Sequence, residues 1–130
     1  MTREALTDVY RRYLDCLNAR RWDDLGEFVA EEVSHNDRPL GLSGYRAMLE
    51  GDVRTIPDLR FVPDRVVVEG DAVACRLVFR CTPQRPFLGF EPTGAPITFV
   101  EHAFYTFRDH RIVEVSSLLD TRAVAAQLSR

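Results

Sequence analysis

RVVVEGDAVACRLVFRC, residues 65–81, is the stretch that decides the fold. Its centre, Gly70-Asp71, lies between two runs rich in β-branched residues and is typical of a two-residue hairpin turn. If Glu69 pairs with Ala72, strand alternation collects seven apolar residues on one face: Val66, Val68, Val73, Cys75, Leu77, Phe79 and Cys81. The other face then carries Arg65, Glu69, Arg76 and Arg80, with Val67 and Val78 among them. This pattern predicts a half-buried antiparallel sheet.

A second hairpin is expected from residues 97–107 and 111–119, around Asp109-His110. With Arg108 opposite Arg111, strict pairing places Phe99 opposite Asp120, Glu101 opposite Leu118 and Tyr105 opposite Glu114, all on one face. His102 then lies on the other face, opposite Ser117. A β-bulge would exchange the two faces. Both Glu101 and His102 are therefore candidates for a site on this sheet.

The chain outside these hairpins is expected to be mostly helical. Apolar residues recur every three or four positions from Leu6 to Leu17 and again from Trp22 to Val29. A third helix is expected after the turn at residues 41–44, with Ser43 as its N-cap and Pro57 beyond its end. A short helix is expected at 121–127. Helices followed by long strands predict an α+β fold, in which a curved antiparallel sheet packs against the N-terminal helices and encloses a pocket, as one domain over residues 1–130.

The composition excludes several classes of function. The 17 basic residues are all arginine, so lysine Schiff-base chemistry and a Walker A loop are excluded. A net charge of −3 without a basic block argues against nucleic acid as a partner. No apolar run approaches a membrane span, and no secretory leader is visible. The three cysteines lack the spacing of a disulfide framework or a zinc site, which favours a reducing cytoplasm. The three histidines are scattered along the chain, so no metal site is expected.

Short motifs distributed along nearly the whole chain resemble one known family. They are VSHN at 33–36, GLSGY at 41–45, IPDLR at 56–60, EGD at 69–71, FLGF at 87–90, PTG at 92–94, FY at 104–105, RD at 108–109, and IVE at 112–114 followed by Asp120. Their order and spacing resemble the SnoaL-like polyketide cyclases, a branch of the nuclear transport factor 2-like superfamily.

The resemblance implies a cone-shaped α+β barrel that often dimerises through its sheet. It also implies an intramolecular aldol ring closure that needs no cofactor or metal. Asp120 matches the family's acid/base position near the end of the last strand, and His35 matches a histidine that reaches into the pocket. Two departures are Ser116, where a tryptophan is usual, and His110, where a glycine is usual. The first concerns the shape of the pocket, and the second concerns only the turn.

We therefore expect a cyclase, acting as a lyase or isomerase, with Asp120 as general acid/base and His35 as its helper. Asp120 has an alternative role as the N-cap of the last helix. An alternative function is epoxide hydrolysis or epoxide-opening cyclisation, in which Asp37 or Asp58 would act with Asp120. A third alternative is a non-catalytic ligand-binding or assembly domain.

The expected partners are a hydrophobic, carbonyl-rich small molecule and a second copy of the chain. A flat ligand needs an aromatic cavity. The residues expected to line it are Tyr13, Trp22, Tyr45, Phe79, Phe87 and Phe99, together with Ser116 at the position of the missing tryptophan.

Overall fold

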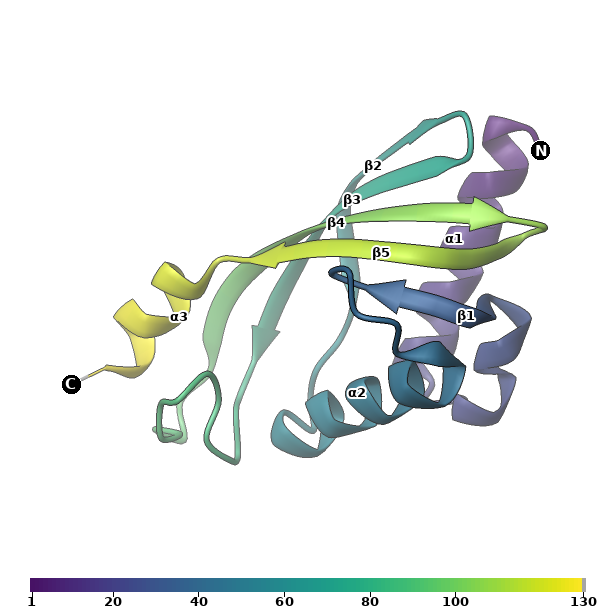
Figure 1. Ribbon diagram of the computed structural model, residues 1–130. Helices are drawn as coiled ribbons and strands as arrows, with labels where there is room; N and C mark the ends of the chain where they lie inside the picture. Colours follow the sequence, from purple (N-terminus) through teal and green to yellow (C-terminus); the bar gives the residue numbers. More distant parts are fainter. Residues whose placement is uncertain (130) are drawn as a thin grey trace.

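The computed structural model describes residues 1–129, and within them three α-helices and a short 3₁₀ helix accompany one strongly curved sheet (Figure 1). The five strands lie in the order β1-β5-β4-β3-β2. The predicted α+β fold is confirmed. In chain order the elements are α1 (Arg3–Asn18), η1 (Trp22–Glu27), β1 (Val29–His35), α2 (Gly41–Thr55), β2 (Val62–Glu69), β3 (Ala72–Cys81), β4 (Ile97–Arg108), β5 (Arg111–Leu119) and α3 (Thr121–Leu128).

The first hairpin forms in the predicted register. Glu69 lies opposite Ala72, and Gly70 takes the positive φ of +60° that the tight turn requires. Alternate residues of β3 from Val73 to Cys81 are buried, as the alternation predicts. The register shifts once, between Pro63 and Arg65, where the strand bends toward its start.

The second hairpin contains a bulge, and the strict pairing predicted for it is wrong. Arg108 lies opposite Arg111 as expected, but the register shifts between Phe107 and Thr106. Beyond the shift, Glu101 lies opposite Leu119, His102 opposite Leu118 and Tyr105 opposite Val115. One extra residue in β5 therefore turns Ser117 toward the helices and Ser116 away from them.

The edge strand β1 is a second difference from prediction. The expected second helix ends after the single 3₁₀ segment η1, and the chain continues as β1, which runs parallel to β5. Its burial pattern lacks strict alternation and its register shifts between Val29 and Ser34. Such an irregular edge strand carries no clear period-two signal.

The helices α1 and α2 lie on the concave side of the sheet and bury the core against it (Figure 1). Thr2 caps α1, accepting a hydrogen bond from the Ala5 N–H at 3.0 Å. The helix α2 begins at Gly41, so Ser43 lies inside its first turn and is not the predicted cap. No helix within residues 1–129 is long and apolar enough to cross a membrane.

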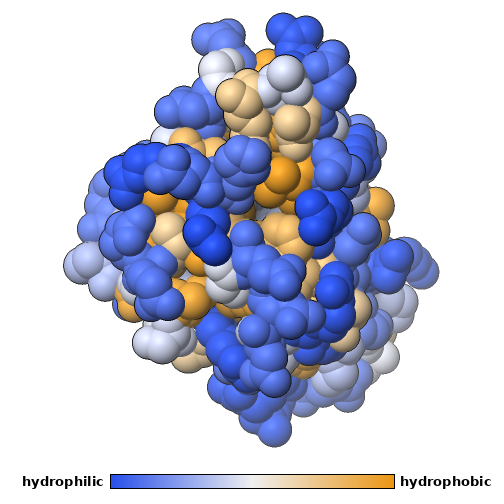
Figure 2. All heavy atoms as spheres, turned by 90° about the vertical axis from the view of Figure 1, so that its right-hand side faces the viewer, coloured by the Kyte–Doolittle hydropathy of each residue, from blue (hydrophilic) through white to orange (hydrophobic). Residues whose placement is uncertain are grey.

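Hydrophilic residues cover most of the end of the molecule shown in Figure 2, where apolar residues emerge only between them. The convex face of the sheet is different. Three large apolar side chains stand exposed there, Val67, Phe104 and Leu118, with 49%, 61% and 79% of their surface accessible. An exposed apolar cluster of this kind on a sheet indicates an interaction surface.

Candidate active site

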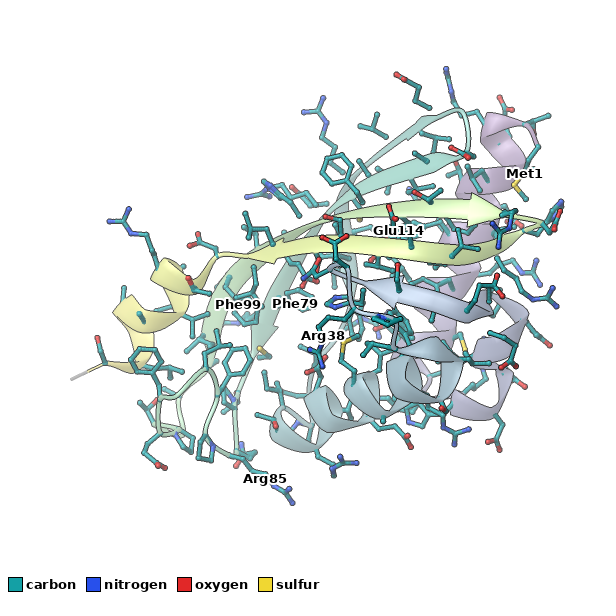
Figure 3. The ribbon with its side chains drawn as sticks, viewed as in Figure 1. Met1, Arg38, Phe79, Arg85, Phe99 and Glu114 are labelled. Atoms are coloured by element: carbon teal, nitrogen blue, oxygen red, sulfur yellow. The ribbon has the colours of Figure 1, made fainter. Side chains whose placement is uncertain are left out.

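A cleft of about 70 Å³ opens between α2, the inner face of the sheet and the loop after β3. Figure 3 shows Phe79 and Phe99 on the side of the sheet that faces α2. Apolar side chains and two carboxyl groups line the cleft. They are Asp52, Ile56, Leu59, Phe61, Phe79, Phe87, Phe99, Glu101 and Leu119.

Four phenylalanines form a continuous row along the cleft, which we call the mouth: Phe61, Phe79, Phe99 and Phe87. Ring centroids are 5.6 Å apart for Phe61 and Phe79, 5.1 Å for Phe79 and Phe99, and 5.7 Å for Phe99 and Phe87. These separations are typical of favourable aromatic pairs. The sequence predicted Phe79, Phe87 and Phe99 as cavity residues, and all three line this cleft. Phe61 was not predicted because it precedes β2 in an irregular segment.

Two carboxyl groups line the cleft together with the phenylalanines of the mouth. Glu101 comes from β4, and Asp52 comes from α2. Burial, and then the neighbouring charge of Asp52, raises the pKa of Glu101 to about 7. Asp52 stays open to solvent at the edge of the cleft, but the protein atoms around it raise its pKa to about 6 by desolvation. The pair therefore retains protons near neutral pH, as catalytic acids and bases do.

Asp52 is a candidate that the sequence analysis missed. It lies on the same helical face as Tyr45, Leu49 and Ile56, at steps of three and four residues. Tyr45, Leu49 and Ile56 are all buried. An acidic residue on the apolar stripe of a helix was the signal that could have identified it.

All four tyrosines of the chain gather deeper in the cone, in a cluster that we call the base: Tyr10, Tyr13, Tyr45 and Tyr105. Ring centroids are 4.8 Å apart for Tyr10 and Tyr105, and 6.0 Å for Tyr13 and Tyr105. The Tyr13 and Tyr45 hydroxyl oxygens lie 2.7 Å apart and share a hydrogen bond. The sequence predicted Tyr13 and Tyr45 as cavity residues, but the structure places them beyond the residues that line the mouth.

The hydroxyls of the base are held in their neutral form. Burial raises the pKa of Tyr13, Tyr45 and Tyr105 well above the usual value, and the Glu101 charge adds to this shift for each of them. The fully buried Tyr10 hydroxyl has no hydrogen-bond partner among the described residues. The phenolic O–H groups of the base therefore stay protonated, with the Glu101 charge adding to the effect of burial.

His35 lies beside the base at the end of β1. Its Nε2 atom is 3.2 Å from the Ser117 hydroxyl, and its ring centroid is 6.3 Å from that of Tyr45. Burial, and then the nearby Arg38, lowers the pKa of His35, so the imidazole is neutral at pH 7. The structure thus places His35 close to Tyr45, but outside the residues that line the cleft.

Asp120 is exposed and lies outside the residues that line the cleft. Its carboxylate accepts a hydrogen bond from the Ala123 N–H at 3.1 Å and caps α3. This is the alternative role that the sequence offered for it. Its neighbour Leu119 lines the cleft instead.

Three other predicted residues also lie outside the cleft. His102 and Ser116 are exposed on the convex face of the sheet. His102 alternates with Glu101 along β4, and the bulge in β5 turns Ser116 outward. Trp22 is half-buried in a shallow surface groove with Leu42 and Arg46. The predicted pocket roles of Ser116 and Trp22 are therefore not supported by their positions.

The carboxylates proposed for epoxide opening do not meet Asp120. Asp37 is exposed in the turn after β1, with a positive φ of 66°. Asp58 is exposed and accepts a hydrogen bond from the Thr82 N–H at 2.8 Å, which ties the loop after β3 to the end of α2. The two carboxyls that do share the cleft are Asp52 and Glu101.

Comparisons with known proteins agree with this architecture. Residues 7–128 match the family model described as SnoaL-like polyketide cyclase. A SnoaL-like polyketide cyclase from Agrobacterium tumefaciens is 46% identical, with a TM-score of 0.92, over 95% of this chain and 98% of that one. TsrD from Streptomyces laurentii has the same fold at 22% identity and a TM-score of 0.86, over 99% of this chain and 98% of that one. None of the curated proteins matches the sequence. The family match spans nearly the whole chain, and the protein therefore belongs to the SnoaL-like polyketide cyclase family.

Proposed function

We propose that this protein closes a ring in a hydrophobic, carbonyl-rich small molecule of the polyketide type by an intramolecular aldol reaction, with Glu101 as general acid/base. The carboxyl group of Glu101, in a phenylalanine-lined cleft and with its pKa raised to about 7, is the observation that carries this proposal. A group with this pKa is ionised in about half of the molecules at pH 7, so it can both take and return a proton.

The aldol ring closure needs no co-reactant, because the proton that Glu101 removes returns to the product. The Glu101 carboxylate removes a proton from the carbon next to one carbonyl, and the electron pair of that C–H bond forms an enolate. The enolate carbon then forms a C–C bond with a second carbonyl carbon, whose π electrons move onto its oxygen. This alkoxide takes the proton from the Glu101 carboxylic acid, which restores the carboxylate and leaves a product isomeric with the substrate.

The phenylalanine row supports the choice of substrate class. Its rings offer flat apolar surfaces that extend from solvent to the Glu101 carboxyl, and a conjugated or partly folded polyketide presents matching faces. At about 70 Å³ the cleft encloses only the reacting end of such a molecule, since pockets that hold a whole drug-sized ligand measure about 300–1,000 Å³.

Asp120 remains the acid/base predicted from the family resemblance, and one comparison of variants decides between it and Glu101. Acetonylacetone is a suitable probe because its isomeric aldol product then loses water to give a conjugated methylcyclopentenone, which absorbance reports. We expect Glu101→Gln to lower the rate of closure by about 10²-fold or more. Asp120→Asn keeps a good helix cap and is expected to change the rate little. Glu27→Gln, an exposed substitution of the same chemistry, is the control.

The opposite ranking of these variants would assign the acid/base role to Asp120. Failure of the wild type to close acetonylacetone or any larger diketone, with ligand binding intact, would favour the non-catalytic binding domain.

The Asp52 and Glu101 pair also supports a second candidate function, hydrolytic or cyclising epoxide opening. Asp52, with a pKa of about 6, would activate a water molecule, while the protonated Glu101 would donate to the epoxide oxygen. Styrene oxide incubated in isotope-labelled water tests this reaction. A diol carrying one labelled oxygen, lost in both Asp52→Asn and Glu101→Gln, would establish hydrolysis.

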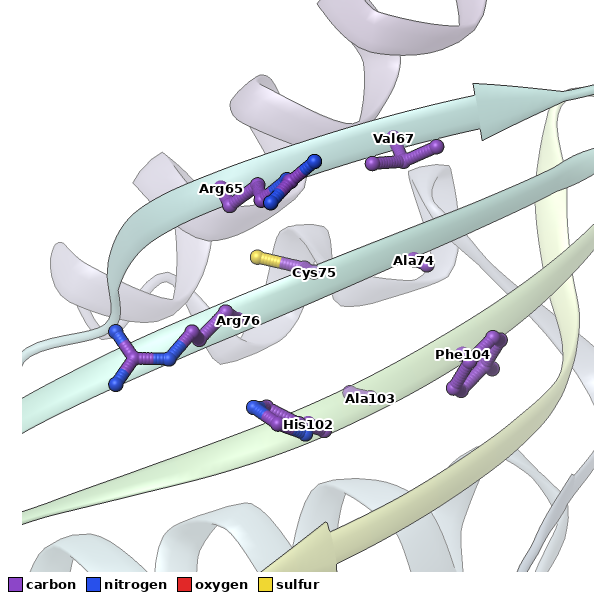
Figure 4. Close-up of a pocket in the computed structure, with 8 residues that line it drawn as sticks. All are labelled: Arg65, Val67, Ala74, Cys75, Arg76, His102, Ala103 and Phe104. Atoms are coloured by element: carbon purple, nitrogen blue, oxygen red, sulfur yellow. The ribbon is translucent and has the colours of Figure 1, made fainter.

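We also propose that the protein forms a homodimer through the convex face of the sheet. Figure 4 shows Val67 and Phe104 on this face with the side chains of Arg65, Arg76 and His102 around them. Leu118 continues the apolar surface onto β5, and the acidic Glu114 lies further along the same face of that strand, so a two-fold arrangement can place acidic and basic edges together. Sedimentation should give a dimer for the wild type and a monomer for Phe104→Glu. A monomeric wild type at micromolar concentration would contradict the proposal.

A further inference from the structure

One wall of the cleft belongs to neither a helix nor a strand. Residues 56–61, which we call the wall, connect α2 to β2, and Ile56, Leu59 and Phe61 line the cleft from this segment. All three side chains are buried. An irregular segment lacks the repeated hydrogen bonds of a helix or a sheet, so other groups must hold its backbone in place.

Asn18, the last residue of α1, holds the end of the wall. Its amide nitrogen donates a hydrogen bond to the Phe61 carbonyl at 3.0 Å, and its amide oxygen accepts one from the Phe61 N–H at 2.7 Å. A residue of a neighbouring antiparallel strand would exchange the same two bonds with its partner. One side chain, 43 residues away in sequence, therefore fixes both polar groups of the Phe61 backbone.

Arg20 holds the middle of the wall. Its guanidinium donates hydrogen bonds to the carbonyls of Pro57 and Leu59, and at 3.0 Å to the carbonyl of Leu17 in α1. The Arg20 backbone has a φ of +59°, which is uncommon for a residue other than glycine. Such a conformation persists where surrounding contacts hold it, and the three carbonyls supply these contacts.

We propose that Asn18 and Arg20 are positioning residues that set the width of the cleft through the wall, and so select the ligands that the cleft admits. This inference deepens the proposed function and rests on the cleft being the ligand site. Neither residue lines the cleft, so each acts through the backbone that it holds. The phenylalanine row then has a clamped end at Phe61 and an adaptable end at Phe87.

The clamp should matter most for a narrow ligand. The Phe61 ring meets Phe79 edge-on, at an interplanar angle of 82°, and a wall held in this position costs a ligand nothing to order. Without the clamp the Phe61 ring can move away from Phe79 and widen the cleft. A narrow ligand then loses contact, while a wider one gains room.

Calorimetric binding of two ketones tests the proposal without turnover. Asn18→Ala should weaken the binding of methylcyclopentenone by about tenfold, as expected for the loss of about 1.4 kcal/mol, and leave that of the wider 1-tetralone unchanged or tighter. Arg20→Gly, in which glycine adopts the positive φ freely, should act in the same direction.

Asn36→Gly is the matched control for both variants. Asn36 makes the same two bonds with the backbone of Ser117, at 3.2 and 2.8 Å, and its φ of +48° suits glycine. Neither Asn36 nor Ser117 lines the cleft, so the ratio of the two affinities should stay at its wild-type value.

Turnover gives a second measurement. Asn18→Ala should lower kcat for acetonylacetone by about tenfold or more, since a displacement of about 1 Å can cost about 10²-fold in rate. The pH dependence of the rate should keep its midpoint, because Glu101 is unchanged. A variant that had only lost folded protein would lower kcat without changing the ratio of the two affinities.

An unchanged ratio of affinities in a folded Asn18→Ala protein would overturn the proposal, and so would an equal change in Asn36→Gly. Phe79→Ala separates this failure from failure of the proposed function, because it removes a ring of the cleft itself. If Phe79→Ala left both affinities unchanged, or if the wild type bound neither ketone at millimolar concentration, the cleft would not be the ligand site and both proposals would fail. Circular dichroism and the thermal midpoint confirm that each variant is folded.

Discussion

The mouth and the base of the cone use the same kind of ring for different purposes. The mouth consists of four phenylalanines, and the base contains all four tyrosines. Phenylalanine suits the mouth because an apolar ring can meet either solvent or a ligand without leaving a donor unpaired. Tyrosine in the base brings hydroxyls into the buried core, where each one needs a hydrogen-bond partner. Glu101 lies between the two regions and acts electrostatically on the base.

The two regions also differ in how they are held. The base comes from α1, α2 and β4, and its rings are almost fully buried. The mouth takes Phe61 and Phe87 from irregular segments, and Phe87 is only half-buried. Between residues 85 and 96 the described hydrogen bonds stay within the segment, such as the pair between Phe87 and Phe90. The rings of the base are therefore firmly held, while the Phe87 side of the mouth can adapt to a ligand.

The largest expected effect is the loss of a ring from the base. Tyr10→Ala removes a fully buried side chain that contacts the rings of Tyr13 and Tyr105. We expect the free energy of unfolding to fall by about 3–5 kcal/mol, measured by urea denaturation. A decrease of less than about 1 kcal/mol in the free energy of unfolding would mean that the neighbouring side chains fill the cavity. The base would then be no more rigid than the mouth.

Glu101 should make stability depend on pH. Its pKa is raised to about 7 in the folded protein from 4.5, so the folded state binds more protons between these values. Stability should therefore fall as the pH rises from about 4.5 to 7, and Glu101→Gln should remove this contribution. At pH 8 the variant should be more stable than the wild type by up to about 2–3 kcal/mol, and at pH 4 the two should be equal. If the free energy of unfolding changed with pH in the same way in both proteins, the buried environment assigned to Glu101 would be contradicted.

Phe87→Ala tests the adaptability of the mouth. The ring is half-buried and lies 5.7 Å from Phe99, so its loss should cost only about 1 kcal/mol of unfolding free energy. The cleft should widen, and larger diketones should close faster relative to acetonylacetone than they do in the wild type. Phe79→Ala is the comparison, since its buried ring contacts both Phe61 and Phe99 and should cost more.

The smallest expected effect has the opposite sign. Tyr10→Phe removes the one buried side-chain oxygen that lacks a partner among the described residues. Its removal should raise the free energy of unfolding by up to about 1 kcal/mol. Tyr13→Phe, which leaves the Tyr45 hydroxyl without its partner, should instead lower it by a similar amount. Equal effects from the two substitutions would show that the Tyr10 hydroxyl is bound by water.

Local rules predicted much of the sheet and part of the mouth. Alternation around Gly70-Asp71 was sufficient to place Phe79 on the inner face, and the apolar stripe of α1 placed Tyr13 there. The predictions failed where one extra residue changed a register. The bulge in β5 moved Ser116 outward, and no feature of the local sequence marked it. The edge strand β1 was missed because its burial does not alternate.

The sequence by itself determined the α+β class, the register of the first hairpin and the presence of an acid, a histidine and aromatic rings for a pocket. These follow from local periodicity and turn chemistry, which operate over a few residues. Only the tertiary structure decided that Glu101, rather than Asp120, lines the cleft, and that Asp52 lies there too. It also decided that Tyr13 meets Tyr45, 32 residues away. Such pairings depend on how α2 packs across the curved sheet, and packing over long separations leaves no period in the sequence.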